Sequence, residues 1–260
     1  MQTLDAATHQ TLDRPRSRAE VLDELRRLLP QLERITADTR ALPFGLPALD
    51  SYLPQGGLAF GALHEVAPDA EGDAPAAFGF VTALLGGLPD GPICLVRSTR
   101  RARGRLHGHG LNALGLDPAR VILVETGGKQ AFWAMEEALR SAVPAAVVGA
   151  IDNGLDLRTS QRLHLAAGES GRLLVLLPPA GAEASAAMTR WRVGAAAAAR
   201  DRFGLIARWR WRVTLERCRN GRPGEWLVEF DHAAHRFSLA AALADPALPD
   251  SARLVQRHSA

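Results

Sequence analysis

A short segment near residue 70 has the layout of a phosphate-binding loop but lacks the side chains that bind phosphate. Residues 64–80 read HEVAPDAEGDAPAAFGF, an apolar run followed by a loop of small residues and a second, helix-like apolar run. A loop of the form GxxxxGK[ST] binds phosphate through backbone amides and a lysine, and its hydroxyl binds magnesium. The four defining positions are occupied here by Ala67, Gly72, Asp73 and Ala74.

Asp73 is the substitution with the largest chemical consequence. It places a negative charge where phosphate charges would lie, and like charges about 4 Å apart repel by about 1 to 4 kcal/mol at effective dielectric constants of 80 to 20. Asp69 and Glu71 add to this repulsion. We therefore predict that the loop does not bind ATP in the usual manner. The protein is then not an enzyme, has no catalytic residues and needs no cofactor.

Other segments that resemble reactive sites fail on spacing. The sequence GGK at 127–129 has Leu123 where a phosphate loop needs its first glycine, and Gln130 where it needs Ser or Thr. It is typical of a turn between a strand and a helix. The histidines at 64, 107 and 109 have no cysteine or carboxylate at ligand spacing, so we predict no metal site.

The positive charge is concentrated in one part of the sequence. The chain has 31 Lys and Arg against 28 Asp and Glu, a net charge of +3. Residues 190–222 carry ten arginines against Asp201 and Glu216, a net charge of +8, which leaves −5 elsewhere. Such clustering favours an anionic partner, DNA or protein. The alternative is an ordinary solvated surface. The candidate residues for the partner surface are Arg208, Arg210, Arg212, Arg219 and Arg222.

Arginine and tryptophan alternate in the segment RWRWR at 208–212. On a strand, successive side chains point to opposite faces, so the arginines share one face and Trp209 and Trp211 share the other. The tryptophans then point into the core, and the arginines face either solvent or a partner.

The hydrophobic pattern predicts an α/β fold. Short apolar runs alternate with segments long enough for helices, which is typical of a mainly parallel sheet whose strands are buried on both faces. The runs cover residues 62–66, 92–97, 121–125, 145–151 and 172–177. After residue 205 the pattern changes to an alternating strand, a turn at 220–224 and a strand at 225–230, with a third strand near 235–239. We expect an antiparallel hairpin there. The alanine run at 195–199 is compatible with a helix.

The N-terminal segment is expected to form a separate amphipathic helix. A capping box at Ser17 and Glu20 precedes apolar residues at helical spacing. This candidate docking helix presents Val21, Leu22, Leu25, Leu28, Leu29 and Leu32. It binds a neighbouring subunit or folds back on its own domain. We expect three parts in the chain: residues 1–40 with this helix, a core domain at 41–240, and a flexible tail at 241–260.

The segment before the loop resembles the start of the RecA recombinase core. The matching residues are Gly45, Leu49, Asp50, Gly56, Gly57, Leu58, Gly61 and Glu65. The resemblance implies a RecA-like core. It places the catalytic glutamate of that family near Thr99 and its magnesium-supporting aspartate at Gly149 or Ala150, with Asp152 two residues further along. All three nucleotide positions are thus altered. Asp152 is the residue left to take a nucleotide role.

Among RecA-like proteins the whole pattern is most similar to the ImuA family. Beyond the opening segment, the similarity includes the closing segment WRVTLERCRNGRPGEWLVEFD at 211–231 and HRFSL at 235–239. The resemblance implies an adaptor or regulator in error-prone translesion synthesis after DNA damage, the SOS response. It implies RecA and an ImuB-like protein as partners, and an error-prone C-family polymerase as an indirect one. DNA binding and self-association remain open, as do two alternatives, a SulA-like cell-division inhibitor and a residual RecA-like ATPase.

The remaining features indicate a cytoplasmic protein, and the resemblance implies association with the nucleoid on damage. No apolar run reaches the roughly 18 residues that a membrane span needs, so no membrane role is expected. The cysteines at 94 and 218 lie in apolar or strand-like runs and show no ligand spacing. We expect both to be free thiols.

Overall fold

The computed structural model describes residues 40–89, 91–98, 106–183 and 185–240. The chain divides into two compact units, Met1–Thr39 and Arg40–Ala260, and all the described residues belong to the second unit. The predicted N-terminal helix, Thr99 and the tail at 241–260 lie outside the described residues.

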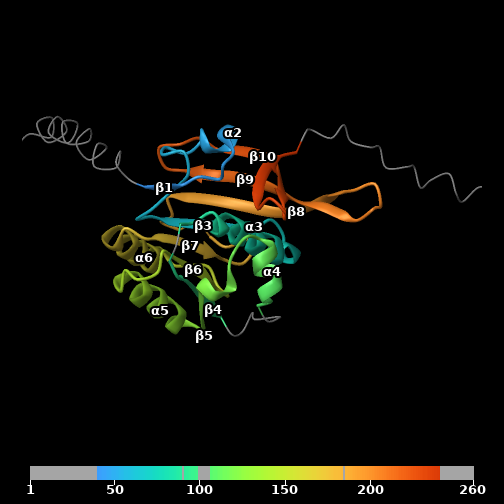
Figure 1. Cartoon of the computed structure of the whole chain (residues 1–260). Coiled ribbons are helices and arrows are strands. Elements are labelled where there is room, and N and C mark those ends of the chain that lie inside the picture. Colours follow the sequence, from blue (N-terminus) through green and yellow to red (C-terminus); the bar gives the residue numbers. More distant parts are fainter. Residues whose placement is uncertain (1–39, 90, 99–105, 184, 241–260) are drawn as a thin grey trace, which may run out of the picture. The chain divides into compact units, whose positions relative to one another are not determined.

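A nine-stranded sheet organises this unit, in the order β11-β10-β9-β8-β3-β7-β6-β4-β5 (Figure 1). Strands β3 to β8 run parallel to one another, and β9, β10 and β11 continue the sheet as an antiparallel meander. This confirms the predicted α/β fold with a mainly parallel sheet and a C-terminal antiparallel hairpin. The strands are β3 (Leu63–Pro68), β4 (Ile93–Ser98), β5 (Val121–Thr126), β6 (Ala146–Ala150), β7 (Leu173–Leu177), β8 (Thr189–Arg200), β9 (Ile206–Cys218), β10 (Gly224–Asp231) and β11 (Arg236–Leu239). Two short strands, β1 (Ala41–Leu42) and β2 (Leu58–Ala59), pair separately.

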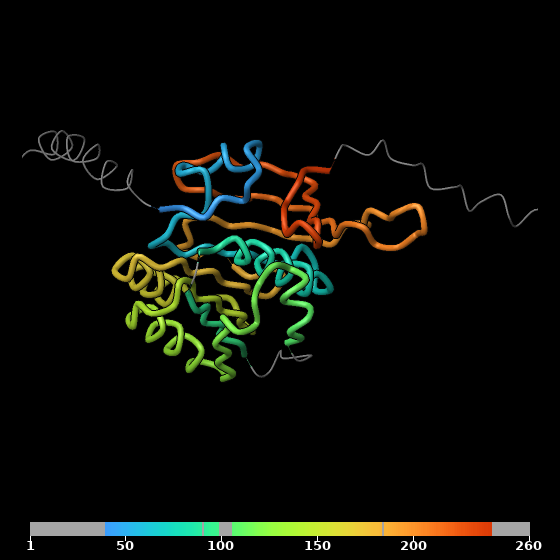
Figure 2. Tube along the Cα trace, viewed as in Figure 1, coloured from blue at the N-terminus to red at the C-terminus, as the bar shows by residue number. Residues whose placement is uncertain are grey.

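Helices cover both faces of the sheet, because the parallel strands are apolar on both sides. On one face α3 packs with the segment 42–60 around Phe44, Phe80 and Trp191. On the other face α5 and α6 pack around Met135 and Leu163. The tube in Figure 2 shows the same arrangement along the chain. The helices are α2 (Pro47–Asp50), η1 (Glu71–Asp73), α3 (Ala74–Gly86), α4 (Gly108–Ala113), η2 (Pro118–Arg120), α5 (Lys129–Arg140) and α6 (Leu157–Ser170).

Strand β5 departs from the prediction that every apolar run is buried. Its sequence VILVET is as apolar as that of the other parallel strands, but Ile122 is 49% exposed and Leu123 is 41% exposed. The reason is its place at the edge of the sheet, where β4 is its one neighbour. Composition alone cannot separate an edge strand from a central one.

The alanine run also differs from its interpretation as helix. Residues 195–199 lie in β8, where Ala195 pairs with Trp211 and Ala196 with Arg210 of β9. Alanine favours helices in isolation, but pairing within a long hairpin overrides so weak a preference. The hairpin therefore begins one strand earlier than the sequence indicated.

Candidate functional site

The loop after β3 has the predicted strand, turn and helix layout. β3 lies inside the sheet between β7 and β8, and α3 starts at Ala74 after a loop at 69–73. Ala67 differs from its expected place, because it lies within β3, buried and paired with Arg192. The alignment with a phosphate loop put the start of the loop too early, since the apolar Ala67-Pro68 pair extends the strand.

The Asp73 carboxylate is bound by backbone amides of its own protein. It accepts a hydrogen bond of 3.2 Å from the Ala70 amide in the loop and one of 2.9 Å from the Ala195 amide in β8. Pro75, in the first turn of α3, has no N–H to offer a ligand. A carboxylate therefore takes up a loop amide that a phosphate loop would present to its ligand.

Of the two other positions that the resemblance linked to nucleotide chemistry, the one at Gly149 or Ala150 lies at the carboxyl end of β6, and the one near Thr99 lies outside the described residues. Gly149 and Ala150 close β6, and Asp152 follows two residues later. Ser98, the last residue of β4, donates its hydroxyl proton to the Asp152 carboxylate. One oxygen of Asp152 is thus engaged within the protein. In the described part of the chain, no group of three His, Cys, Asp or Glu residues is arranged to hold a metal ion.

The arginines of β8 and β9 gather on one face of the sheet. Trp211 points into the core as predicted, since it is 5% exposed and packs edge-on against Phe80 of α3, whereas Trp209 is half-buried and stacks on Phe230. The opposite face carries Arg190 and Arg192 from β8, and Arg208, Arg210 and Arg212 from β9.

Acidic residues interleave with these arginines. Within this charged face, ion pairs join the five arginines to five carboxylates, so its formal charge is balanced. The pairs are Arg190 with Glu65 (3.6 Å) and Glu216 (3.2 Å), Arg192 with Glu216 and Asp69 (3.9 Å), Arg208 with Glu229 (3.2 Å) and Asp231 (3.9 Å), Arg210 with Glu229 (2.5 Å), and Arg212 with Asp69 (3.6 Å). The charged face is therefore much less positive than the net charge of +8 counted over residues 190–222 suggested.

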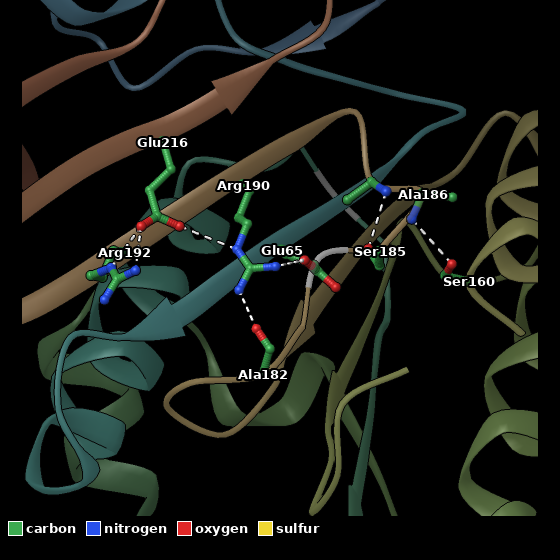
Figure 3. Close-up of polar contacts among 9 residues, drawn as sticks. Glu65, Ser160, Ala182, Ser185, Ala186, Arg190, Arg192 and Glu216 are labelled. Atoms are coloured by element: carbon green, nitrogen blue, oxygen red, sulfur yellow. Dashed lines mark hydrogen bonds and ion pairs between the residues drawn. The ribbon is translucent and has the colours of Figure 1, made fainter. Parts of the chain in front are cut away.

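Glu65 is the most buried carboxylate of this face, with 2% of the residue exposed. Arg190 lies beside it from the neighbouring strand β8 (Figure 3). Burial raises the pKa of Glu65 above its usual range, against the opposing effects of the Ser185 hydroxyl and the nearby Arg190 and Arg217 guanidinium groups. Removing one partner of such a buried ion pair strongly destabilises the folded protein, because the other charge is left buried without compensation. Sequence analysis matched Glu65 to a family position but missed its pairing with Arg190, because no spacing signal connects residues 125 positions apart.

The five arginines proposed as a partner surface do not come together in one place. Arg208 to Arg212 lie in the first half of β9, whereas Arg219 follows its other end, about 23 Å from Arg212 and about 37 Å from Arg208 along an extended strand. Arg219 donates to the Ala186 carbonyl at 3.1 Å, and the Arg222 guanidinium lies 4.0 Å from the centre of the Tyr52 ring. The proposed partner surface stays a prediction. It would consist of two separate parts, one at Arg208 to Arg212 and one at Arg219 and Arg222.

Comparison with known proteins identifies the family. The chain is 39% identical over 228 residues to Protein ImuA of Caulobacter vibrioides strain NA1000 / CB15N, and equally to that of strain ATCC 19089 / CIP 103742 / CB 15. In both cases the match covers 80% of this chain and 91% of the relative. The chain belongs to the ImuA family. No protein-family model matches the chain.

Membership of the ImuA family confirms the resemblance drawn from the opening and closing segments of the sequence. None of the helices in the described part of the chain is both long and apolar enough to cross a membrane.

Proposed function

We propose that the protein is a non-catalytic, RecA-like adaptor or regulator in SOS-induced, error-prone translesion DNA synthesis. Its membership of the ImuA family supports this role. The observation that carries the non-catalytic part is Asp73, which brings a negative charge to the loop and binds the Ala70 and Ala195 amides. The position of β3 between β7 and β8 supports a RecA-like core, with the loop at the carboxyl end of a central strand.

The proposed partners are RecA and an ImuB-like protein, with an error-prone C-family polymerase as an indirect partner. The helix expected at residues 17–34 is proposed as a docking element for RecA or for a second copy, separate from the core domain at 41–240. An amphipathic helix of this length is marginal alone in water and needs a surface to cover its leucines. The cytoplasm, and the nucleoid after damage, is the proposed location.

Calorimetry with ATP and magnesium should give no saturable heat. The charge on Asp73, the missing lysine and the missing hydroxyl remove the groups that normally hold the phosphates and the metal. RecA in the same buffer provides the positive control. A micromolar site that disappears when residues 67–74 are mutated would show instead that the protein is a residual ATPase with a rearranged loop.

Co-purification tests the adaptor role directly. The protein should retain RecA and an ImuB-like protein, and light scattering of the eluted complexes gives their stoichiometry. The tubulin-like cell-division protein serves as the competing bait. Retention of that protein, with neither RecA nor the ImuB-like protein bound, would favour the SulA-like alternative and overturn the proposal.

A further inference from the structure

The β8–β9 hairpin continues past the rest of the sheet as a two-stranded arm. Pairing of β8 with β3 ends at Val193, and pairing of β9 with β10 ends at Trp209. Beyond those points the two strands pair with each other alone, through Ala199 with Arg208 and Arg200 with Ile206. We call residues 197–208 the arm. Figures 1 and 2 show it in orange, reaching beyond the other elements of its unit.

The tip of the arm exposes large apolar side chains to solvent. Phe203 is 71% exposed, Leu205 is 66% exposed and Ile206 is 50% exposed. An isolated two-stranded hairpin is marginally stable in water, and exposed apolar side chains add nothing to its stability. Three such side chains together on a protruding element mark an interaction site rather than a scattered surface residue.

The arginines at the tip of the arm are not neutralised by the nearby carboxylate of Asp201. The Asp201 carboxylate accepts hydrogen bonds from the amides of Phe203 (2.8 Å) and Leu205 (2.9 Å), so it is used in shaping the turn. The Arg202 guanidinium lies 4.6 Å from the centre of the Phe203 ring, and Arg200 donates to the Gly204 carbonyl at 2.6 Å. Among the described residues, neither Arg200 nor Arg202 forms an ion pair with a carboxylate, unlike the arginines of the charged face.

An aromatic ring beside unpaired arginines is the combination that recognises single-stranded nucleic acid. Bases stack on aromatic side chains, guanidinium groups contribute stacking and cation–π contacts, and arginines neutralise phosphates. We infer that the arm binds single-stranded DNA, with a base stacked on the open face of Phe203 and phosphates beside Arg200 and Arg202.

The same features argue against duplex DNA as the main partner. Inserting an apolar side chain into a duplex costs a few kcal/mol per base step, whereas a single strand already exposes its base faces. Two unpaired arginines offer little electrostatic energy to offset that cost.

Fluorescence anisotropy with a labelled oligothymidylate tests the inference on the full-length protein. The intact protein should bind at low salt, and Phe203→Ala should weaken binding by about 5- to 150-fold, the loss expected for one base stack. The double variant Arg200→Gln/Arg202→Gln should flatten the plot of log affinity against log salt by about 1.4, from two phosphates on a single strand. Both variants should unfold at the wild-type temperature, because the altered side chains are exposed.

Matched variants elsewhere on the surface are the controls. Trp133→Ala removes an equally exposed aromatic ring from α5, and Arg158→Gln/Arg236→Gln removes two exposed arginines from α6 and β11. Both should bind the oligonucleotide as the intact protein does. The inference is overturned if the intact protein does not bind, or if Phe203→Ala binds as Trp133→Ala does. It is also overturned if the arm variants keep DNA and lose RecA or the ImuB-like protein instead. Because the assay needs neither partner, its failure leaves the adaptor role standing.

Discussion

We expect acidification from pH 7 to about pH 4.5 to reduce the free energy of unfolding by about 2.5 kcal/mol through His64 alone. Burial lowers the pKa of His64 from 6.5 to about 4 in the folded protein. Below pH 6.5 the unfolded chain takes up a proton at this residue, but the folded protein does so only near pH 4. The stability that His64 contributes is therefore complete above pH 6.5 and is lost as the pH falls toward 4.

Burial explains why the folded protein does not take up this proton, and the hydrogen bond to the Ala59 carbonyl partly opposes that effect on the pKa. The ring is fully buried, and Nε2 donates to the Ala59 carbonyl at 2.9 Å. Trp191 donates its indole N–H to the Thr189 hydroxyl at 2.8 Å, so that hydroxyl donates its own proton to Nδ1 of His64, also at 2.8 Å. A second ring proton would leave two donors facing each other inside the core.

Urea unfolding at a series of pH values measures the effect. His64→Gln should be less stable than the intact protein at pH 7. Between pH 7 and pH 4.5, however, the free energy of unfolding of the intact protein should fall by about 2.5 kcal/mol more than that of His64→Gln. His109→Gln removes an exposed histidine and should keep the pH dependence of the intact protein. An equal pH dependence in His64→Gln and the intact protein would show that His64 is not the titrating group.

The sequence carried enough information for the order of the elements and for the family. The five apolar runs became β3 to β7 because parallel strands are apolar on both faces, and RWRWR became a strand with Trp211 inward. The matched positions from Gly45 to Glu65, together with the closing segments at 211–231 and 235–239, sufficed to recognise the family, because they form a spaced pattern rather than a composition.

What the sequence could not predict is the contact between segments far apart in the chain. The positive count at 190–222 suggested a basic ridge, yet Glu229 and Asp69 reach Arg210 and Arg212 from neighbouring segments and offset much of the charge. Likewise, Asp73 binds the Ala195 amide, a partner 122 residues away. These contacts depend on which strands pair and in what register, and local sequence preferences do not predict that pairing. For the same reason the arm was not foreseen, since alanines at 195–199 favour helix when considered alone.

Arg190→Met should reduce the free energy of unfolding by about 3 kcal/mol at pH 7. Removing one partner of a buried ion pair leaves the other charge without compensation, and such changes typically cost about 3 to 5 kcal/mol. The lower end applies here because the Ser185 hydroxyl and Arg217 still act on Glu65. Arg212→Met provides the matched control, because that side chain is 55% exposed and pairs with a half-exposed Asp69, an arrangement worth about 1 kcal/mol or less.

A double variant and the pH dependence separate the role of Glu65 from the other bonds of Arg190. Arg190 also contacts Glu216 and the Ala182 carbonyl, so its loss has more than one consequence. If the uncompensated carboxylate dominates, Arg190→Met/Glu65→Gln should recover most of the lost stability. Because the folded pKa of Glu65 is raised above its ordinary 4.5, the neutral carboxyl favours the folded state, and that stability is lost as the pH rises through the folded pKa. The cost of Arg190→Met should accordingly shrink at acidic pH, where Glu65 is protonated. A double variant as unstable as Arg190→Met, with a cost that does not change with pH, would assign the loss to Glu216 and Ala182 instead.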